Sequence, residues 1–362
     1  MKKLHLHHRI WKIILAFSLL SLIFVACVPE TPTPTPTIPP TETPTADLTP
    51  TSTPTPRPSP TPTLPPLGTD GNPITIGFIP PQNGLGNSAI DDFVNTLIDE
   101  TDYVIEAFLY PDFQALSDAL LDGEIHLVWL KPFEYLYLNQ QDAAEVMLMT
   151  NHLGVYAYGI QYMAHVNRGF LPYFDPETNQ PIGEPIDALQ QLSGTRPCLI
   201  DPQSIPGNFV PLGLLAIAST PTLDPVFTYS YNAMIRALYI QGICDFGVSF
   251  ALTGDPLTSS DIMQNLPDAQ EQIMIIWQSD GIIPNLNLSA SPALPQFIRF
   301  RLEEAVIRIA DSPTGLTMIS TALDYNVEAL RSIQDHFYNP FRAAIAPLEL
   351  DLEAILFPSP EP

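Results

Sequence analysis

Basic residues are scarce in this chain. Lysine and arginine together number 14, against 39 aspartates and glutamates, which gives a formal net charge of −25 at pH 7. Four of the 14 lie near the amino terminus, and Lys131 is the only lysine after residue 72. A surface this acidic does not suit nucleic acid or an electrostatic attachment to anionic lipid. We therefore expect no nucleic acid among the partners of the folded part.

Long apolar runs are also scarce. The run nearest the amino terminus, residues 13–25, is shorter than a typical transmembrane helix. A basic start precedes it and Ala26-Cys27 follows it, as in a secretory signal peptide. The string FVAC resembles a bacterial lipobox, although Phe24 stands where an aliphatic residue is usual. This predicts a signal peptide at residues 1–26 and a lipidated Cys27 that anchors the protein to the outside of the cell membrane. Ordinary secretion with an incidental cysteine is the alternative.

Apolar residues are almost absent from the segment that follows. Residues 27–71 consist largely of alternating threonine and proline. Such a composition cannot bury a core and favours an extended polyproline II conformation. We interpret this segment as a semi-stiff spacer between the membrane anchor and a folded body. Its threonines are candidate glycosylation sites.

Cysteine is rare, with three residues in the whole chain. Besides Cys27 there are Cys198 and Cys244, each near the end of an apolar, strand-like run. Neighbouring strands would allow one disulfide between them in an exported protein, and two free thiols are the alternative. The histidines of the folded part are scattered, and no cysteine spacing is typical of zinc or iron–sulfur sites. We predict no metal and no cofactor.

The first part of the folded body alternates between strands and helices. Strand-like runs occupy residues 74–80, 103–110 and 125–130, and helical patterns occupy residues 89–97, 112–122 and 133–139. Asp112 is a candidate helix N-cap, and Gly123 is a candidate stop. This alternation predicts a parallel α/β sheet.

The second part contains a further α/β set. A strand-rich stretch at 155–167 suggests a crossover, and helices are expected at 186–192, 212–218 and 232–242, with a strand at 243–250. Residues 273–291 are strand-like and lead back, and 295–310, 313–322 and 327–337 are predicted to be helical. We expect one lobe, residues 72–153 plus 284–350, interrupted by a second, residues 154–283, and a flexible tail at 351–362.

The string LIDPQSIPGNFVP at residues 199–211 is a candidate anion site. An apolar run meets Asp201-Pro202, a turn carries Ser204 and Gly207, and an apolar, helix-like segment follows. The free N–H groups and the positive dipole end of a helix that starts after such a turn favour an anion. An ordinary strand–turn–helix connection has the same pattern.

Several strings together resemble the substrate-binding proteins of phosphate, phosphite and phosphonate ABC transporters. The matching strings are ITIGFIP, DFQALSDALLDGEIHLVWLKPFEYL, GTRPCLIDPQSIPG, ALYIQGICDFG and IIPNLNL, which span most of residues 74–310. The resemblance implies a two-lobe, periplasmic-binding-protein-like α/β fold of type II with two hinge crossovers. It also implies a ligand bound between the lobes and an ABC permease as partner.

In that family the turn reads Asp-Pro-x-Ser-[Ser/Thr]-Ser-Gly, and its hydroxyl and N–H groups hold phosphonate oxygens. Here Asp201 and Ser204 match, but Ile205 and Pro206 replace two hydroxyl residues, and proline also lacks an N–H group. Carried over position by position, the resemblance yields these candidate ligand-binding residues: Gln82, Tyr110, Phe113, Lys131, Tyr158, Ser204, Ile205, Gly207, Tyr231, Asn232 and Asn285.

Some of these candidates depart from the family. Phe113 stands where tyrosine is common, Tyr231 or Asn232 stands near a family histidine, and Asn285 stands near an acidic residue that meets a ligand amine. Lys131 replaces a common glycine at the carboxyl end of a strand, where open α/β sheets bind ligands. It is either a source of positive charge for the altered turn or an ordinary surface lysine. Tyr158 and neighbouring aromatics form either a cleft wall or core packing.

The predicted function is that of a membrane-anchored, monomeric solute-binding protein of an ABC importer. The ligand is expected to be small and polar or oxyanionic, such as a phosphonate or phosphate. A ligand-sensing or interaction module with the same fold and no transport role is the alternative. An enzyme is not expected, because the sequence has no G-x-S-x-G elbow, no cluster of metal ligands and no catalytic cysteine context.

Overall fold

The computed structural model describes residues 64–81, 84, 86–251, 266 and 268–358. The described residues all belong to one compact unit, Pro62–Pro362. The predicted signal peptide, Cys27, most of the threonine/proline segment and Gln82 lie outside the described residues. None of the described helices combines the length and apolarity needed to cross a membrane.

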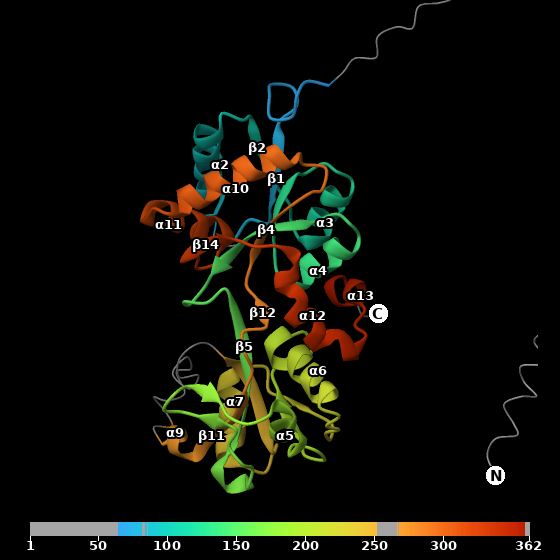
Figure 1. Cartoon of the computed structure of the whole chain (residues 1–362), viewed down its shortest axis with the longest axis vertical. Coiled ribbons are helices and arrows are strands. Elements are labelled where there is room, and N and C mark those ends of the chain that lie inside the picture. Colours follow the sequence, from blue (N-terminus) through green and yellow to red (C-terminus); the bar gives the residue numbers. More distant parts are fainter. Residues whose placement is uncertain (1–63, 82–83, 85, 252–265, 267, 359–362) are drawn as a thin grey trace, which may run out of the picture. The chain divides into compact units, whose positions relative to one another are not determined.

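The first lobe is built on a six-stranded sheet in the order β14-β4-β13-β3-β1-β2. Its strands are β1 (Ile74–Phe78), β2 (Ile105–Leu109), β3 (Leu127–Leu130), β4 (Glu145–Asn151), β13 (Asn287–Ala290) and β14 (Ala329–Ser332). Strand β1 pairs in parallel with β2 and β3, as the alternating pattern predicted, whereas β13 is antiparallel to β3 and β4. The helices of this lobe are α2 (Gly86–Thr101), α3 (Phe113–Leu121), α4 (Pro132–Gln140), α10 (Gln296–Ala310) and α11 (Pro313–Leu323) (Figure 1).

The second lobe is built on the sheet β11-β5-β10-β8-β9. Its strands are β5 (Ala157–His165), β8 (Pro197–Leu199), β9 (Val226–Phe227), β10 (Phe246–Ala251) and β11 (Ile273–Gln278), and β12 (Ile283–Pro284) pairs with the start of β5. Its helices are α5 (Pro185–Gln190), the π-helical turn η2 (Ile205–Phe209), α6 (Val210–Ile217), α7 (Tyr231–Ile240) and α9 (Ala269–Gln272). A 3-10 turn, η1 (Val166–Arg168), and a small hairpin of β6 (Phe174–Asp175) and β7 (Gln180–Pro181) also belong to this lobe.

Cys198 and Cys244 form a disulfide, which decides between the two alternatives that the sequence left open. Cys198 lies in β8, which runs parallel to β10, and Cys244 stands just before β10. Both residues are buried. The disulfide therefore links the chain on either side of α7 beneath that helix.

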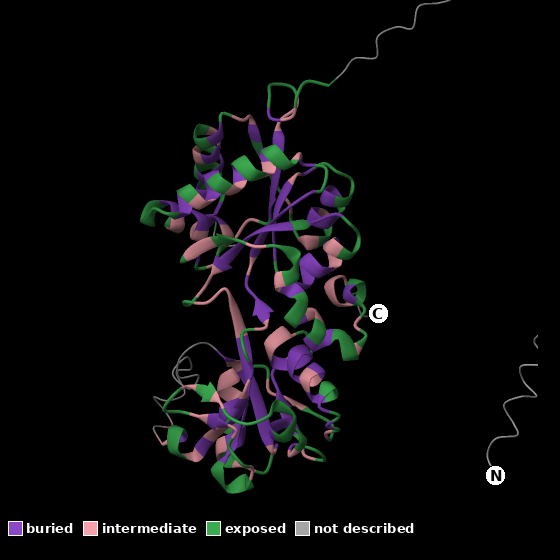
Figure 2. Ribbon diagram, in the orientation of Figure 1, coloured by how far each residue is buried: buried purple, intermediate pink, exposed green. Residues whose placement is uncertain are grey.

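Local signals explain most element boundaries. Asp112 caps α3, because its side chain accepts a hydrogen bond from the Ala115 N–H, as predicted. Gly123 follows α3 with a positive φ of 74°, which a glycine adopts at little cost. The strands and the inner faces of the helices are buried, whereas the outer faces of the helices are exposed (Figure 2). Amphipathic periodicity therefore set the orientation of the helices on each sheet.

Two passages of the chain connect the sheets, one between β4 and β5 and one between β12 and β13. The buried Asn285 joins them: its side-chain amide donates to the carbonyl of Thr150 (3.2 Å) and to that of Val155 (2.7 Å). These passages lie close to the predicted lobe boundaries at residues 153 and 284. The two-lobe α/β architecture with two crossovers is therefore the one expected from the sequence.

Two predictions near the carboxyl terminus are wrong. Residues 327–337 were expected to be helical, but they contain β14 and the 3-10 turn η3 (Asp335–Tyr338). Strand pairing with β4 supplies this segment with backbone hydrogen bonds from a distant part of the chain, which outweighs its local helical preference. Strand β4 itself was not predicted from its residues.

The second error concerns the tail. Residues 351–362 were predicted to be flexible, yet Leu352–Leu356 form helix α13, whose first turn is capped by the Asp351 carboxylate. Leu352 is buried, and the Phe357 ring stacks on Phe113. Helix α12 (Asn339–Ile345) and the turn η4 (Ala346–Leu348) precede α13. The apolar residues of this segment have partners in both lobes, which a linear pattern does not reveal.

Candidate functional site

Several of the predicted ligand-binding residues follow the carboxyl ends of parallel strands. Tyr110 follows β2 and Lys131 follows β3 in the first lobe. In the second lobe Ser204 follows β8, and Tyr231 follows β9. Open α/β sheets bind ligands at such strand ends. The candidate site is therefore assembled from the strand ends of both sheets.

The turn after β8 has the strand–turn–helix form expected from its sequence. The Asp201 carboxylate accepts from the Gln203 N–H (2.8 Å), and the Ser204 N–H donates to the Asp201 carbonyl (3.0 Å). The Ser204 hydroxyl then accepts from the Gly207 N–H (3.0 Å) and caps η2, which continues directly into α6. The helix start therefore already has one of its free N–H groups satisfied from within the chain.

Gly207 is required by packing. A Cβ at this position would lie 2.5 Å from the Ile200 Cβ and 2.7 Å from the Ser204 hydroxyl oxygen. The next residue, Asn208, is 7% exposed, and its side-chain amide donates to the Pro202 carbonyl (2.8 Å). Its Oδ1 is buried and has no hydrogen-bond partner within the described part of the chain. The turn is thus closely packed, with one unused acceptor beneath it.

The loops after β8 and β9 meet at two hydroxyl groups. Tyr231, the first residue of α7, has its phenol near the Ser204 hydroxyl. Burial raises the pKa of Tyr231 to about 12, so the phenol is a neutral hydrogen-bond donor at physiological pH. Its ring packs edge-on against Phe250, with centroids 4.9 Å apart. Asn232 follows in the same helical turn and is half-buried.

A third phenol extends this group towards the first lobe. Tyr158, at the start of β5, has its pKa raised by burial, with smaller contributions from Tyr231 and Tyr325. Tyr325 lies between α11 and β14, near the Thr150 side chain, and has its pKa raised by burial to about 12. Tyr158 thus lies between a phenol of each lobe. Sequence reasoning did not identify Tyr325, because no motif surrounds it and only the fold brings it to the hinge.

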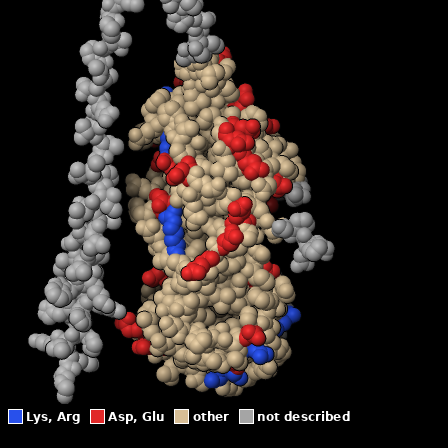
Figure 3. Space-filling view, turned by 90° about the vertical axis from the view of Figure 1, so that its right-hand side faces the viewer, with Lys and Arg blue, Asp and Glu red and all other residues tan. Residues whose placement is uncertain are grey.

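The start of α4, in the first lobe, carries charged side chains. Lys131 is the N-cap residue, and its backbone N–H donates to the Glu134 carboxylate (2.8 Å). Its side chain is 74% exposed, with Nζ 3.7 Å from the other carboxylate oxygen of Glu134. Burial raises the pKa of Glu134, and the nearby Lys131 opposes that shift. Acidic side chains outnumber basic ones on the face shown in Figure 3. Lys131 is the only lysine after residue 72.

The two helix starts meet through aromatic rings. Phe133 of α4 lies 5.2 Å from Phe209, at the end of η2, measured between ring centroids. Phe133 also stacks on Phe341 of α12 at 5.6 Å. One continuous buried cluster contains residues of both lobes, including these three rings. The helix starts of the two lobes are therefore in van der Waals contact.

Other predicted residues have partners within the fold. Phe113 stacks on Phe357, with centroids 5.6 Å apart, and Asn285 holds the two hinge passages together. Tyr110 lies beside Gly77, and burial, with a smaller contribution from Glu124, raises its pKa. The structure thus brings together Ser204, Ile205, Gly207, Tyr231 and Tyr158, whereas Phe113 and Asn285 contact protein groups elsewhere.

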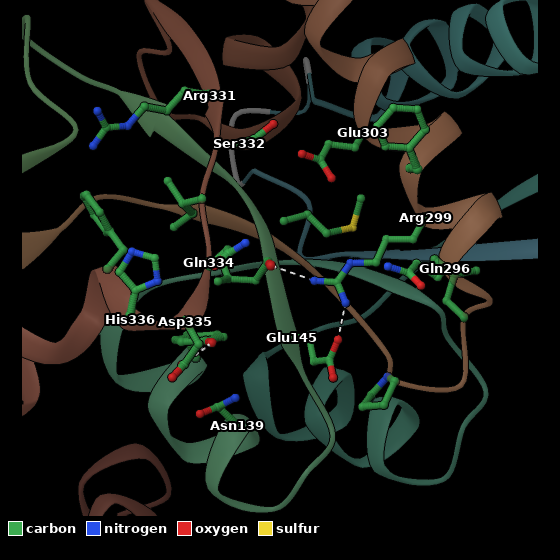
Figure 4. A pocket seen from close by; sticks show the side chains of 18 of the residues that line it. Asn139, Glu145, Gln296, Arg299, Glu303, Arg331, Ser332, Gln334, Asp335 and His336 are labelled. Carbon is green, nitrogen blue, oxygen red and sulfur yellow. Dashed lines mark hydrogen bonds and ion pairs between the residues drawn. The ribbon is translucent and has the colours of Figure 1, made fainter.

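A separate hollow of about 1310 Å³ lies on the first lobe. Figure 4 shows Arg299 reaching across it to the Glu145 carboxylate and the Val146 carbonyl, with Asp335, His336 and Arg331 on the opposite side. None of the predicted ligand-binding residues lines this hollow. The described residues also contain no group of three or more histidine, cysteine, aspartate or glutamate side chains suited to a metal ion.

Residues 76–338 match the family described as "ABC transporter, phosphonate, periplasmic substrate-binding protein". That range contains both sheets except the first two residues of β1, and it includes the two hinge passages and the turn after β8. No curated protein matches the chain at a significant level.

Solved structures with the same fold are distant in sequence. XAC2383 from Xanthomonas citri bound to ATP is 14% identical, with 76% of this chain and 96% of that chain covered and a TM-score of 0.52. The same protein bound to chloride is 15% identical, with coverage of 76% and 97% and a TM-score of 0.51. PhnD1 from Prochlorococcus marinus in complex with methylphosphonate is 13% identical, with coverage of 76% and 98% and a TM-score of 0.45.

The likeness to XAC2383 and the family match together confirm the predicted two-lobe, type II periplasmic-binding-protein fold. The family consists of solute-binding proteins that act outside the cytoplasm with ABC transporters, and it is not a family of enzymes. The match covers well over half of the chain. The chain therefore belongs to the phosphonate periplasmic substrate-binding proteins of ABC transporters.

Proposed function

We propose that this protein is the extracytoplasmic solute-binding lipoprotein of an ABC importer, anchored to the cell membrane through Cys27. It works as a monomer, holds a small polar or oxyanionic ligand between its lobes and delivers that ligand to a permease. The turn from Ser204 to Gly207, at a helix start beside Tyr231, is the observation that carries the proposal. There the Ser204 hydroxyl and the Tyr231 phenol lie near a helix N-terminus of the second lobe.

The ligand is of the phosphonate or phosphate class. Two phenols, Tyr231 and Tyr158, stay protonated at neutral pH because burial raises their pKa, so both can donate hydrogen bonds to an oxyanion. The Ser204 hydroxyl and the positive end of the η2–α6 helix add to this set. Lys131 contributes positive charge from the first lobe through its long, exposed side chain.

Binding is weaker than in family members with a full set of hydroxyl residues in the turn. Ile205 has no side-chain donor, and Pro206 has neither a hydroxyl nor an N–H group. Each missing charge-assisted hydrogen bond costs about 1.5–3 kcal/mol. We expect the phenols to replace part of this loss, which shifts preference towards larger or less highly charged oxyanions than phosphate.

Capture requires no covalent chemistry. The ligand contacts groups of both lobes in the closed form and therefore shifts the equilibrium towards closure. The two hinge passages, joined by Asn285, permit that motion. The closed form is the one presented to the permease.

A thermal-shift experiment on the purified protein tests the ligand class. The panel contains methylphosphonate, phosphite, phosphate, a short alkylsulfonate, a small amine and ATP, the last because XAC2383 binds it. A ligand at a hundred times its dissociation constant stabilises the protein by about 2.7 kcal/mol. We expect stabilisation by at least one phosphorus oxyanion and none by the amine. Absence of a shift with every oxyanion would overturn the proposed ligand class.

The lipid anchor has its own test. Mass spectrometry of the membrane fraction is expected to find Cys27 as the first residue of the mature chain, carrying lipid. The Cys27→Ala variant is expected to leave the membrane fraction while its folded part melts as before. An unmodified Cys27 in the mature protein would favour ordinary secretion.

A further inference from the structure

The last helices of the chain lie beyond the part that matches the family. The family match ends at residue 338, and residues 339–357 form α12, η4 and α13. We call this segment the C-terminal strap. Helix α13 contacts α4 of the first lobe, whereas α12 and η4 contact α6 of the second lobe (Figure 1). The strap therefore touches both lobes at once.

Its attachment to the first lobe is aromatic and polar. The Phe357 ring stacks on Phe113 at 5.6 Å, with only 4° between the ring planes, and meets Tyr137 edge-on at 5.3 Å. The Arg342 guanidinium donates to the Asn139 side-chain oxygen of α4 (2.8 Å). Contacts on both sides of α4 thus hold the strap to the first lobe.

Its attachment to the second lobe is a close backbone approach. A Cβ built on Gly213, in α6, would lie 1.9 Å from the Ala344 carbonyl oxygen of α12. The two helices touch there only because residue 213 has no side chain, and any substitution must push them apart. This contact holds α6 of the second lobe against α12 of the strap, in addition to the two covalent passages between the lobes.

The strap also reaches the proposed ligand site. Phe341 is fully buried and stacks on Phe133, which in turn contacts Phe209 at the end of the η2 turn. One row of three rings thus runs from the strap through the start of α4 to the start of α6. Separating the lobes along this side exposes these rings to water, which is unfavourable.

We propose that the C-terminal strap is a third, non-covalent connection between the lobes that limits how far the cleft opens. Opening requires α6 to detach from α12, so the strength of the Gly213–Ala344 contact sets the balance between open and closed forms. The biological consequence rests on the proposed function, since it concerns ligand capture. The mechanical connection itself needs no ligand.

Spin–spin distance measurements without ligand test the proposal. Labels go on the exposed Asp122→Cys in the first lobe and Asp224→Cys in the second, in the full-length chain carrying Cys27→Ala. The native disulfide stays in place. The chain with an intact strap is expected to give one narrow distance distribution. Gly213→Ala is expected to shift it to longer distances or add a longer population.

Gly315→Ala is the matched control. A Cβ there would lie 1.9 Å from the Ile309 carbonyl oxygen, the same distance as at Gly213, but the contact is between α11 and the end of α10 within the first lobe. We expect Gly315→Ala to lower the melting temperature without changing the label distance. An equal change of distance in this control would overturn the proposal.

A second variant, Phe357→Ala, is used if Gly213→Ala does not fold. Loss of the Phe357 ring should loosen α13 from α3 and α4. Hydrogen exchange of the α12 amides then reports whether the strap is released, and we expect this exchange to become about tenfold faster. A released strap with unchanged label distances would overturn the proposal. A shifted distance in a protein that no oxyanion stabilises would keep the strap and reject the proposed ligand class.

Discussion

Two helices begin where parallel strands end, α4 after β3 in the first lobe and η2–α6 after β8 in the second. Both have a proline in their first turn, and both are capped from within the chain. At α4 the backbone N–H of Lys131 donates to a buried carboxylate, that of Glu134. At η2 the capping group is the neutral Ser204 hydroxyl.

This difference separates two otherwise similar helix starts by charge. A carboxylate at α4 already satisfies the positive end of the helix and repels a second anion. A hydroxyl at η2 leaves the helix charge uncompensated and can itself turn towards an oxyanion. The second lobe is therefore the half of the site that is suited to anions, and the first lobe depends on Lys131 to offset Glu134.

The largest effect is expected from separating the two helix starts. Phe133→Ala removes the ring that contacts both Phe209 and Phe341 and is expected to cost about 3–5 kcal/mol of unfolding free energy. Phe93→Ala, in the other core cluster of the first lobe, is the control for a lost core ring. Urea unfolding measures stability, and calorimetric titration with methylphosphonate measures affinity. Unchanged affinity in Phe133→Ala would mean that contact between the helix starts is irrelevant to binding.

Gly207→Ala tests the η2 start alone. The new methyl group would overlap Ile200, so we expect a loss of about 1–3 kcal/mol in unfolding free energy and a weaker response to oxyanions. Gly123→Ala provides a contrast, since its Cβ would meet no atom within 4 Å and its cost comes from the positive φ alone. Equal loss of oxyanion binding in both variants would show that overall stability, not the turn, decides the response.

Ser204→Ala removes the neutral cap. Loss of a serine N-cap is expected to cost about 0.5–2 kcal/mol of stability, and affinity for an oxyanion should fall by about 1.5–3 kcal/mol more. Ser230→Ala is the matched control, because Ser230 caps α7 through the Ala233 N–H in the same way. Thermal melts with and without methylphosphonate separate the loss of stability from the loss of affinity. A control that loses as much affinity as Ser204→Ala would contradict the assignment of Ser204 to the site.

Glu134→Gln removes the charge difference between the helix starts. Because burial raises the pKa of Glu134, the native state binds this proton more tightly than the unfolded state. Glu134 therefore contributes to stability below pH 4.5, which is the ordinary pKa of a glutamate. This contribution is lost as the pH rises through the raised pKa of the folded state. Glu134→Gln should lack this pH-dependent loss and bind oxyanions more tightly by roughly 0.3–1 kcal/mol. Unfolding curves across this pH range that match those of the parent protein would reject the buried carboxylate as the cause.

Lys131→Met is expected to have the smallest effect on stability. The side chain is mostly exposed, so the unfolding free energy should change by less than about 0.5 kcal/mol. Affinity for methylphosphonate should nevertheless fall and lose part of its salt dependence, because no positive charge then balances the Glu134 carboxylate. Arg236→Met, an exposed cation on α7, is the control and should leave affinity unchanged. Unchanged affinity in Lys131→Met would remove this lysine from the site.

The sequence alone was sufficient where the structural signal is local. The alternation of strands and helices, the Asp112 cap and the turn at Ser204 are read within a few residues, because caps and turns are satisfied by near neighbours. The disulfide was identified as a possibility from two strand-end cysteines, and the pairing of β8 with β10 realised it. The family strings then predicted the two lobes, and the family match agrees.

The tertiary structure decided whatever depends on partners distant in sequence. Strand β14 exists because it pairs with β4 across more than a hundred residues, and Tyr325 reaches Thr150 and the neighbourhood of Tyr158 only through the fold. The helices of the C-terminal strap are held by α4 and α6, which no local pattern records. The difference between the two helix starts likewise depends on the fold, since it places the buried Glu134 carboxylate at the start of α4 and the half-buried Ser204 hydroxyl at the start of η2.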